Sequence, residues 1–155
     1  MTQLQRLGTL MIAGLLVSAG SIAQEKRIKR EDLPAPVAKT VDDQGTNVSI
    51  RGFSTEKKKG QTYYEAHLTV SGHNKDILIS ADGTIVEVEE EVAFDSLPDG
   101  VKQALKTKAG NGQIRKVEAL TKKQKLVAYE AQIATNGKKS EIQVGPDGGP
   151  LAHKE

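Results

Sequence analysis

Two kinds of hydrophobic periodicity follow one another along residues 33–155. Around Val37–Val41 and Val101–Leu105, apolar residues three and four positions apart predict two short helices, each with one buried stripe. Behind each helix, apolar and polar residues alternate, as in strands that bury one side. The strands predicted in this way are 48–53, 64–70, 77–79 and 84–90 after the first helix, and 114–120, 127–133 and 142–144 after the second.

The same landmarks occur twice at a nearly constant spacing. Leu33-Pro34 returns as Leu97-Pro98, Tyr64-Glu65-Ala66 as Tyr129-Glu130-Ala131, and Asp82-Gly83 as Asp147-Gly148. We therefore predict an α+β fold of two tandem repeats, each a short helix followed by an antiparallel meander of three to four strands. The predicted repeats are 33–92 and 93–155, with the last strand of the second short or missing.

The N-terminal segment differs from the rest of the chain. In residues 1–23 the only charged side chain is Arg6, an apolar run follows, and small residues precede Gln24. This pattern predicts a secretory signal peptide cleaved after Ala23. The apolar run, Leu7–Gly20, is shorter than the ~20 residues that a membrane-spanning helix needs, so we predict a periplasmic or secreted protein without an integral membrane segment in the mature chain. The charged, unpatterned residues 24–32 predict a disordered leader.

Composition narrows the function classes. The absence of cysteine excludes disulfides, thiol chemistry and cysteine-bound zinc. The 22 basic and 20 acidic residues are evenly spread, and aromatic residues make up only 3% of the chain. Since nucleic-acid binding relies on basic patches and often on aromatic stacking, we expect no nucleic-acid partner.

The order of these motifs resembles a known family. Leu-Pro-x-x-Val at Leu33–Val37, the Tyr64-Glu65-Ala66 strand and the Asp82-Gly83 turn resemble a PepSY domain. The tandem, exported arrangement is similar to the β-lactamase-inhibitor-like, PepSY-like group of small bacterial proteins, over Leu33 to about Leu151. The resemblance implies a non-catalytic extracytoplasmic module, associated in some members with restraining peptidases or other enzymes. It supplies no catalytic residues.

The sequence also lacks the motifs of common active sites. It has no Gly-x-Ser-x-Gly, P-loop or dinucleotide fingerprint, so we expect a protein that is not an enzyme and holds no cofactor. His67 and His73 do not have the spacing of a zinc site, and no metal is predicted. Glu65 and Glu130 occupy equivalent positions, and we expect each to face solvent opposite a lysine or arginine of the next strand.

Two surfaces are candidates for binding. The first is the exposed sheet face, which would contact a protein partner in the cell envelope and modulate or inhibit a peptidase or another envelope protein. It comprises Glu65, His67, Thr69, Glu130 and Gln132. The alternative is an electrostatic adaptor that binds an anionic envelope component through two lysine-rich hairpin tips. These tips comprise Lys57, Lys58, Lys59, Lys122, Lys123 and Lys125, although lysines at such positions also serve to block edge pairing.

A run of acidic residues ends the first predicted repeat. Glu87, Glu89, Glu90 and Glu91 lie on its last strand. We expect them to form a solvated acidic edge.

Overall fold

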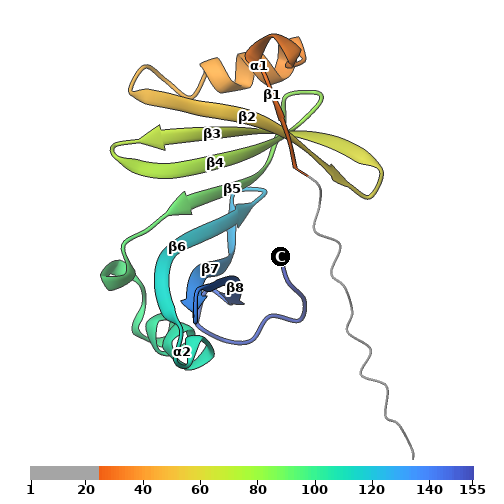
Figure 1. Cartoon of the computed structure of the whole chain (residues 1–155). Coiled ribbons are helices and arrows are strands. Elements are labelled where there is room, and N and C mark those ends of the chain that lie inside the picture. The colour runs from red at the N-terminus through yellow and green to blue at the C-terminus, as the bar shows by residue number, and fades with distance from the viewer. Residues whose placement is uncertain (1–24) are drawn as a thin grey trace, which may run out of the picture.

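The strands pair in the order in which they follow one another along the chain (Figure 1). The computed structural model describes residues 25–155, and within this range it contains a single antiparallel sheet. Its strands are β1 (Lys26–Ile28), β2 (Val48–Lys58), β3 (Gln61–Val70), β4 (His73–Ser80), β5 (Ile85–Glu91), β6 (Gln113–Lys122), β7 (Lys125–Thr135) and β8 (Lys138–Val144). Helix α1 (Ala35–Asp42) precedes β2, and α2 (Asp99–Ala109) lies between β5 and β6. Two short 3₁₀ turns are at Arg30–Asp32 and Phe94–Ser96.

The predicted fold class is wrong. β5 pairs with β6, from Glu87 opposite Lys122 to Glu91 opposite Glu118, so one eight-stranded sheet runs across the boundary drawn at residue 92. The structure is mostly β, with helices of only 8 and 11 residues, and not two tandem helix-plus-meander repeats. The physical reason is that a strand left at an edge exposes a row of unpaired N–H and C=O groups, which pairing satisfies.

The individual strands agree better with the sequence. All seven predicted strand segments lie in β2 to β8 within one residue, and in the described chain no strand follows β8. The two lysine-rich segments lie at the β2–β3 and β6–β7 hairpin tips, as predicted.

The leader was predicted wrongly. Within residues 24–32, Lys26–Ile28 form β1 and pair with the edge of β2, with Ile28 opposite Phe53. Ile28 packs against the apolar cluster beneath α1, while the neighbouring charged side chains stay in water. One apolar side chain and a free strand edge therefore suffice to order this segment. The predicted signal peptide, 1–23, lies outside the described residues.

Both helices cover the same face of the sheet, one at each end (Figure 1). The strand register shows this. Val88 of β5 packs in the cluster under α1, and Glu90, two residues later, points to the same side of the sheet. Glu90 pairs with Ala119, which pairs with Tyr129 of the cluster under α2, so both clusters lie on one side. The two clusters are aliphatic, as the composition indicates. Their buried members are Val37, Val41, Phe53, Ala66, Leu68, Ile77 and Ile79 under α1, and Leu97, Val101, Leu105, Val117, Ala131 and Val144 under α2.

The Asp-Gly turns dock on the helices. The Thr40 hydroxyl of α1 donates a hydrogen bond to the Gly83 carbonyl at 2.6 Å, and a Cβ atom on Gly83 would lie 2.8 Å from the Pro36 carbonyl oxygen. Gly148 lies against the start of α2, where a Cβ atom would lie 2.9 Å from the Val101 nitrogen. Glycine is required at these turns because the backbone of the helix occupies the place of a side chain.

We expect Gly148→Ala to destabilise the protein more than Gly137→Ala. Both glycines have a positive φ, of +87° and +77°, but a Cβ atom on Gly137 meets nothing within 4 Å. Gly137→Ala should therefore lower the free energy of unfolding by about 1–2 kcal/mol, from backbone conformation alone. The clash with α2 should raise the loss for Gly148→Ala by a further ~1–3 kcal/mol. Urea denaturation measures both, and equal losses would refute the docking of this turn.

Candidate functional site

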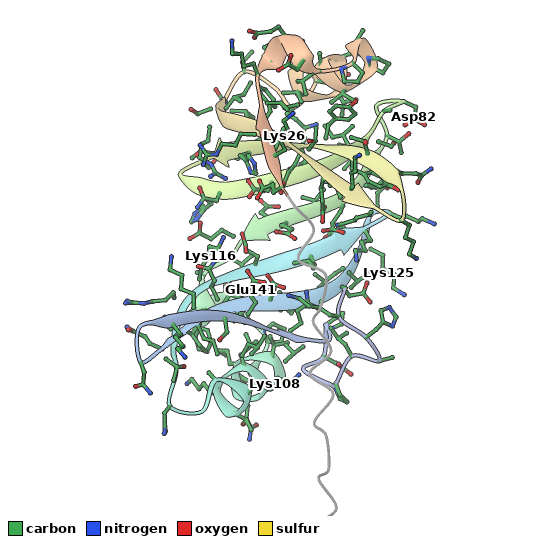
Figure 2. The ribbon with its side chains drawn as sticks, turned by 45° about the vertical axis from the view of Figure 1, so that its right-hand side comes forward. Lys26, Asp82, Lys108, Lys116, Lys125 and Glu141 are labelled. Atoms are coloured by element: carbon green, nitrogen blue, oxygen red, sulfur yellow. The ribbon has the colours of Figure 1, made fainter. Side chains whose placement is uncertain are left out.

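The sheet face opposite the helices carries rows of charged side chains across the strands. One row runs from Ser54 through Glu65, Leu78 and Glu87 to Lys122. The next contains His67, Asp76, Glu89 and Leu120. A third places Glu118 between Glu91 and Glu130. Figure 2 labels Lys116 and Glu141, which lie farther along this polar face.

A groove of about 570 Å³ lies on this polar face. Its charge is strongly negative, because nine carboxylates and only two lysines line it. The carboxylates are Glu25, Glu56, Glu65, Asp76, Glu87, Glu89, Glu130, Glu141 and Glu155, and the lysines are Lys58 and Lys154. The apolar residue Leu78, which is largely buried, is also part of its lining. Such a surface attracts cations and repels anions. We call it the acidic groove.

Glu89 of β5 is one of the acidic residues that line the groove. The sequence placed it on a solvated acidic edge, and this is wrong because β5 is an interior strand with β4 and β6 on either side. The pKa of the Glu89 carboxyl is raised from its ordinary 4.5 to about 8, mainly because burial disfavours the charged form. Repulsion from the carboxylates of Glu118 and Glu87 adds to the rise.

Glu65 and Glu130 line the groove but do not face the expected basic partners. The residues directly across from Glu65 are Ser54 and Leu78, and those across from Glu130 are Glu118 and Gln143. Each carboxylate instead accepts a hydrogen bond from a neutral side chain, Ser54 at 3.0 Å and Gln143 at 2.7 Å. Burial is the main cause that raises the pKa of both carboxyls.

The other predicted face residues lie beside the groove. His67 Nδ1 is 3.4 Å from Asp76 Oδ1, and its Nε2 is 3.2 Å from the Ser54 hydroxyl. The hydrogen bond to Asp76 is the largest cause that raises the pKa of His67. Thr69 and Gln132 occupy the same face, opposite Asn74 and Glu141, and neither lines the groove.

The lysine-rich tips divide into two kinds of side chain. Lys58 Nζ is 3.1 Å from Glu56 and 3.7 Å from Glu87, and Lys122 Nζ is 3.4 Å from the same Glu87 oxygen. These two lysines therefore turn inward and neutralise groove carboxylates. The remaining four are exposed: Lys57, Lys59, Lys123 and Lys125.

A lysine distant in sequence also enters the groove. Lys154 Nζ is 3.1 Å from Glu141 and 3.6 Å from Glu130. Beside it, Glu155 accepts an ion pair from Lys122 at 3.2 Å. Sequence reasoning assigned no role to Lys154, Glu25 or Asp76, because nothing in a local pattern indicates which distant strand or segment will lie beside them.

No family model and no curated protein matches this chain. Solved structures do match, at low sequence identity. A periplasmic protein from Bacteroides eggerthii is 17% identical, with a TM-score of 0.61 over 76% of this chain and 84% of that one. A BLIP-like protein from Bacteroides fragilis is 21% identical, with a TM-score of 0.55 over 77% of this chain and 83% of that one. A DUF2874-family protein from Bacteroides uniformis is 15% identical, with a TM-score of 0.59 over 77% of this chain and 86% of that one.

The fold is that of BLIP-like and DUF2874 proteins. This agrees with the predicted resemblance to the β-lactamase-inhibitor-like group. None of these three structures is described as a PepSY protein, so the PepSY part of the resemblance is not confirmed. The predicted periplasmic or secreted localisation agrees with the description of the Bacteroides eggerthii neighbour as periplasmic. Among residues 25–155, no helix has both the length and the apolar character needed to cross a bilayer.

We expect Glu89→Gln to stabilise the protein, and increasingly so as the pH rises. Since the folded-state pKa is about 8 and the ordinary value is 4.5, the folded protein keeps a proton that the unfolded chain releases between these pH values. Wild-type stability therefore falls with rising pH in this window, whereas glutamine does not ionise. The variant should gain roughly 1–3 kcal/mol at pH 8 and little at pH 4.5.

Urea denaturation at several pH values between these limits measures this gain. Glu90→Gln is the matched control, because Glu90 is exposed and its side chain points to the opposite face. A Glu89→Gln variant that is no more stable than wild type at pH 8 would refute the raised pKa of the Glu89 carboxyl.

Proposed function

We propose that this protein is an exported, non-catalytic binding module that holds a lysine- or arginine-bearing segment of another envelope protein in its acidic groove. The groove has nine carboxyl groups against two lysines, an excess of acidic groups that remains when Glu89 is protonated, and this observation carries the proposal. Charge complementarity of this kind speeds association and selects among partners.

The shape and lining of the groove favour a protein segment as the partner. The groove includes residues from β2 to β5 and from β7 and β8, so an extended chain fits along it better than a single small ion. Its apolar floor at Leu78 suits the methylene stems of lysine and arginine, whose charged ends would reach the surrounding carboxylates.

Glu89 gives the groove a way to respond to a bound cation. With a pKa of about 8, its carboxyl is largely protonated at neutral pH in the unbound protein. An ammonium or guanidinium group brought close to it favours the ionised form, so binding releases a proton and forms an ion pair. The strength of binding should therefore rise between pH 6 and pH 9, flanking the Glu89 pKa of about 8.

Modulation of a peptidase or another enzyme is the biological role that we infer for this binding. It is supported by the resemblance of the sequence to PepSY-like proteins and by the name of the BLIP-like neighbour from Bacteroides fragilis. A module that covers a basic segment of an enzyme would restrict access to that segment.

The alternative role, an adaptor for an anionic envelope component, has weaker support. Lys58 and Lys122 are paired with Glu87 and lie beside an acidic groove that repels polyanions. Binding of an anionic component would therefore depend on the four exposed lysines of the hairpin tips, Lys57, Lys59, Lys123 and Lys125.

Charge reversal in the groove tests the proposed function. Wild-type protein and Glu89→Lys would be used to capture proteins from a periplasmic extract of the native host, and each captured protein would then be purified and titrated directly against both. The introduced lysine would lie among Glu118, Glu87 and Glu130 and place a positive charge in the groove. We expect the affinity to fall roughly tenfold or more, about 1.4 kcal/mol.

The matched control is Glu31→Lys, which makes the same substitution, with at least as large a change in charge, at a side chain that is 69% exposed and lies outside the groove. It should retain binding. A deca-lysine peptide serves as a charge-only probe, whose binding should weaken from about 0.05 M to about 0.5 M salt. Equal binding of the captured protein by wild type and Glu89→Lys would refute the proposal.

A further inference from the structure

Three potential metal ligands converge at the β1 end of the polar face. Glu25 directly precedes β1, and Glu65 and His67 are neighbours on the same side of β3. One ligand atom from each lies within 4.8 Å of the other two. His67 Nε2 is 3.3 Å from Glu25 Oε1 and 3.9 Å from Glu65 Oε2. Figure 2 labels Lys26, the residue after Glu25 and the first of β1, which pairs with the edge of β2.

The imidazole of His67 is held in a fixed orientation. Its other nitrogen, Nδ1, faces Asp76 Oδ1 at 3.4 Å, and Asp76 in turn accepts a hydrogen bond from Arg51 at 2.6 Å. A carboxylate on the far nitrogen is the usual device by which proteins orient a metal-binding histidine and raise its basicity. This leaves Nε2 facing the two glutamates and the Ser54 hydroxyl, which is 3.2 Å away.

We propose that Glu25, Glu65 and His67 form a binding site for Zn²⁺, oriented by Asp76. One imidazole and two carboxylates are a donor set that suits zinc, whereas calcium and magnesium favour oxygen ligands alone. Three protein ligands leave a fourth coordination position for water or for a group of a bound partner. The inference is independent of the proposed function, since the metal is titrated without any partner.

The competing explanation is a purely structural cluster. In it, a protonated His67 supplies the positive charge among Glu25, Glu65 and Asp76, and no metal is required. The two explanations differ in whether added zinc binds at these side chains and stabilises the fold.

Isothermal titration of untagged, EDTA-treated protein with ZnCl₂ tests the site. We expect saturable binding of one equivalent and a rise in Tm with added zinc. His67→Ala should abolish this binding, and Asp76→Asn should weaken it roughly 10- to 100-fold. His73→Ala is the matched control, because His73 lies at the start of β4 outside the cluster, and it should bind as wild type does.

Glu25→Gln keeps the test decisive if the His67 variant does not fold. Glu25 is 55% exposed and precedes the edge strand, so its loss should leave the fold intact and weaken zinc binding at least several-fold. Absence of zinc binding to the wild type would overturn the proposal. Undiminished binding by Glu25→Gln, or equally strong saturable binding of Ca²⁺, would also overturn it. Failure of the groove to bind a basic protein would leave the zinc result unaffected.

Discussion

The pairing of β5 with β6 is the interaction on which the rest of the structure depends. It joins two helix-covered parts of the chain, each with its own aliphatic cluster, into one sheet. Without it, Glu87–Glu91 would lie at an edge, well hydrated and away from Glu118 and Glu130. With it, they lie between β4 and β6, and the acids of neighbouring strands surround them. The concentration of negative charge therefore follows directly from a backbone pairing.

The concentration of negative charge on the polar face lowers the stability of the fold, and the burial of aliphatic side chains beneath the helices offsets this loss. A sheet face shaped for stability alone would place opposite charges across from one another, since like charges in that position repel. Here Glu118 lies directly opposite Glu130, and the pKa of Glu89 is raised to about 8. Local rules of this kind are broken most often where a protein has a function to perform.

The sequence contained most of the local structure and little of the site. Period-two alternation located β2 to β8, and proline and glycine marked the helix boundaries, because these signals depend only on residues close in the chain. Alternation also placed Glu65 and Glu130 on a common face correctly. It does not indicate which strands become neighbours, however, and this is why the acidic run of β5 was placed at an edge.

The errors at β1 and at the cluster around His67 have the same origin. Lys26–Ile28 has too little pattern to predict a strand, and its order derives from the edge of β2. Glu25 approaches His67 from just before β1 and Asp76 from within β4, so no spacing along the chain indicates that the three lie together. Sites assembled from several strands are visible in the register of a sheet and not in its sequence.

The position of Lys154 changes the meaning of an affinity measured at this surface. Its ammonium group already lies 3.1 Å from Glu141 and 3.6 Å from Glu130, so a guest cation arriving there replaces a resident one. Recognition at this end of the groove is an exchange, and the observed free energy is the difference between two similar contacts. Lys58 is a second resident cation, beside Glu56 and Glu87, so a guest gains most selectivity between these two lysines, around Glu89.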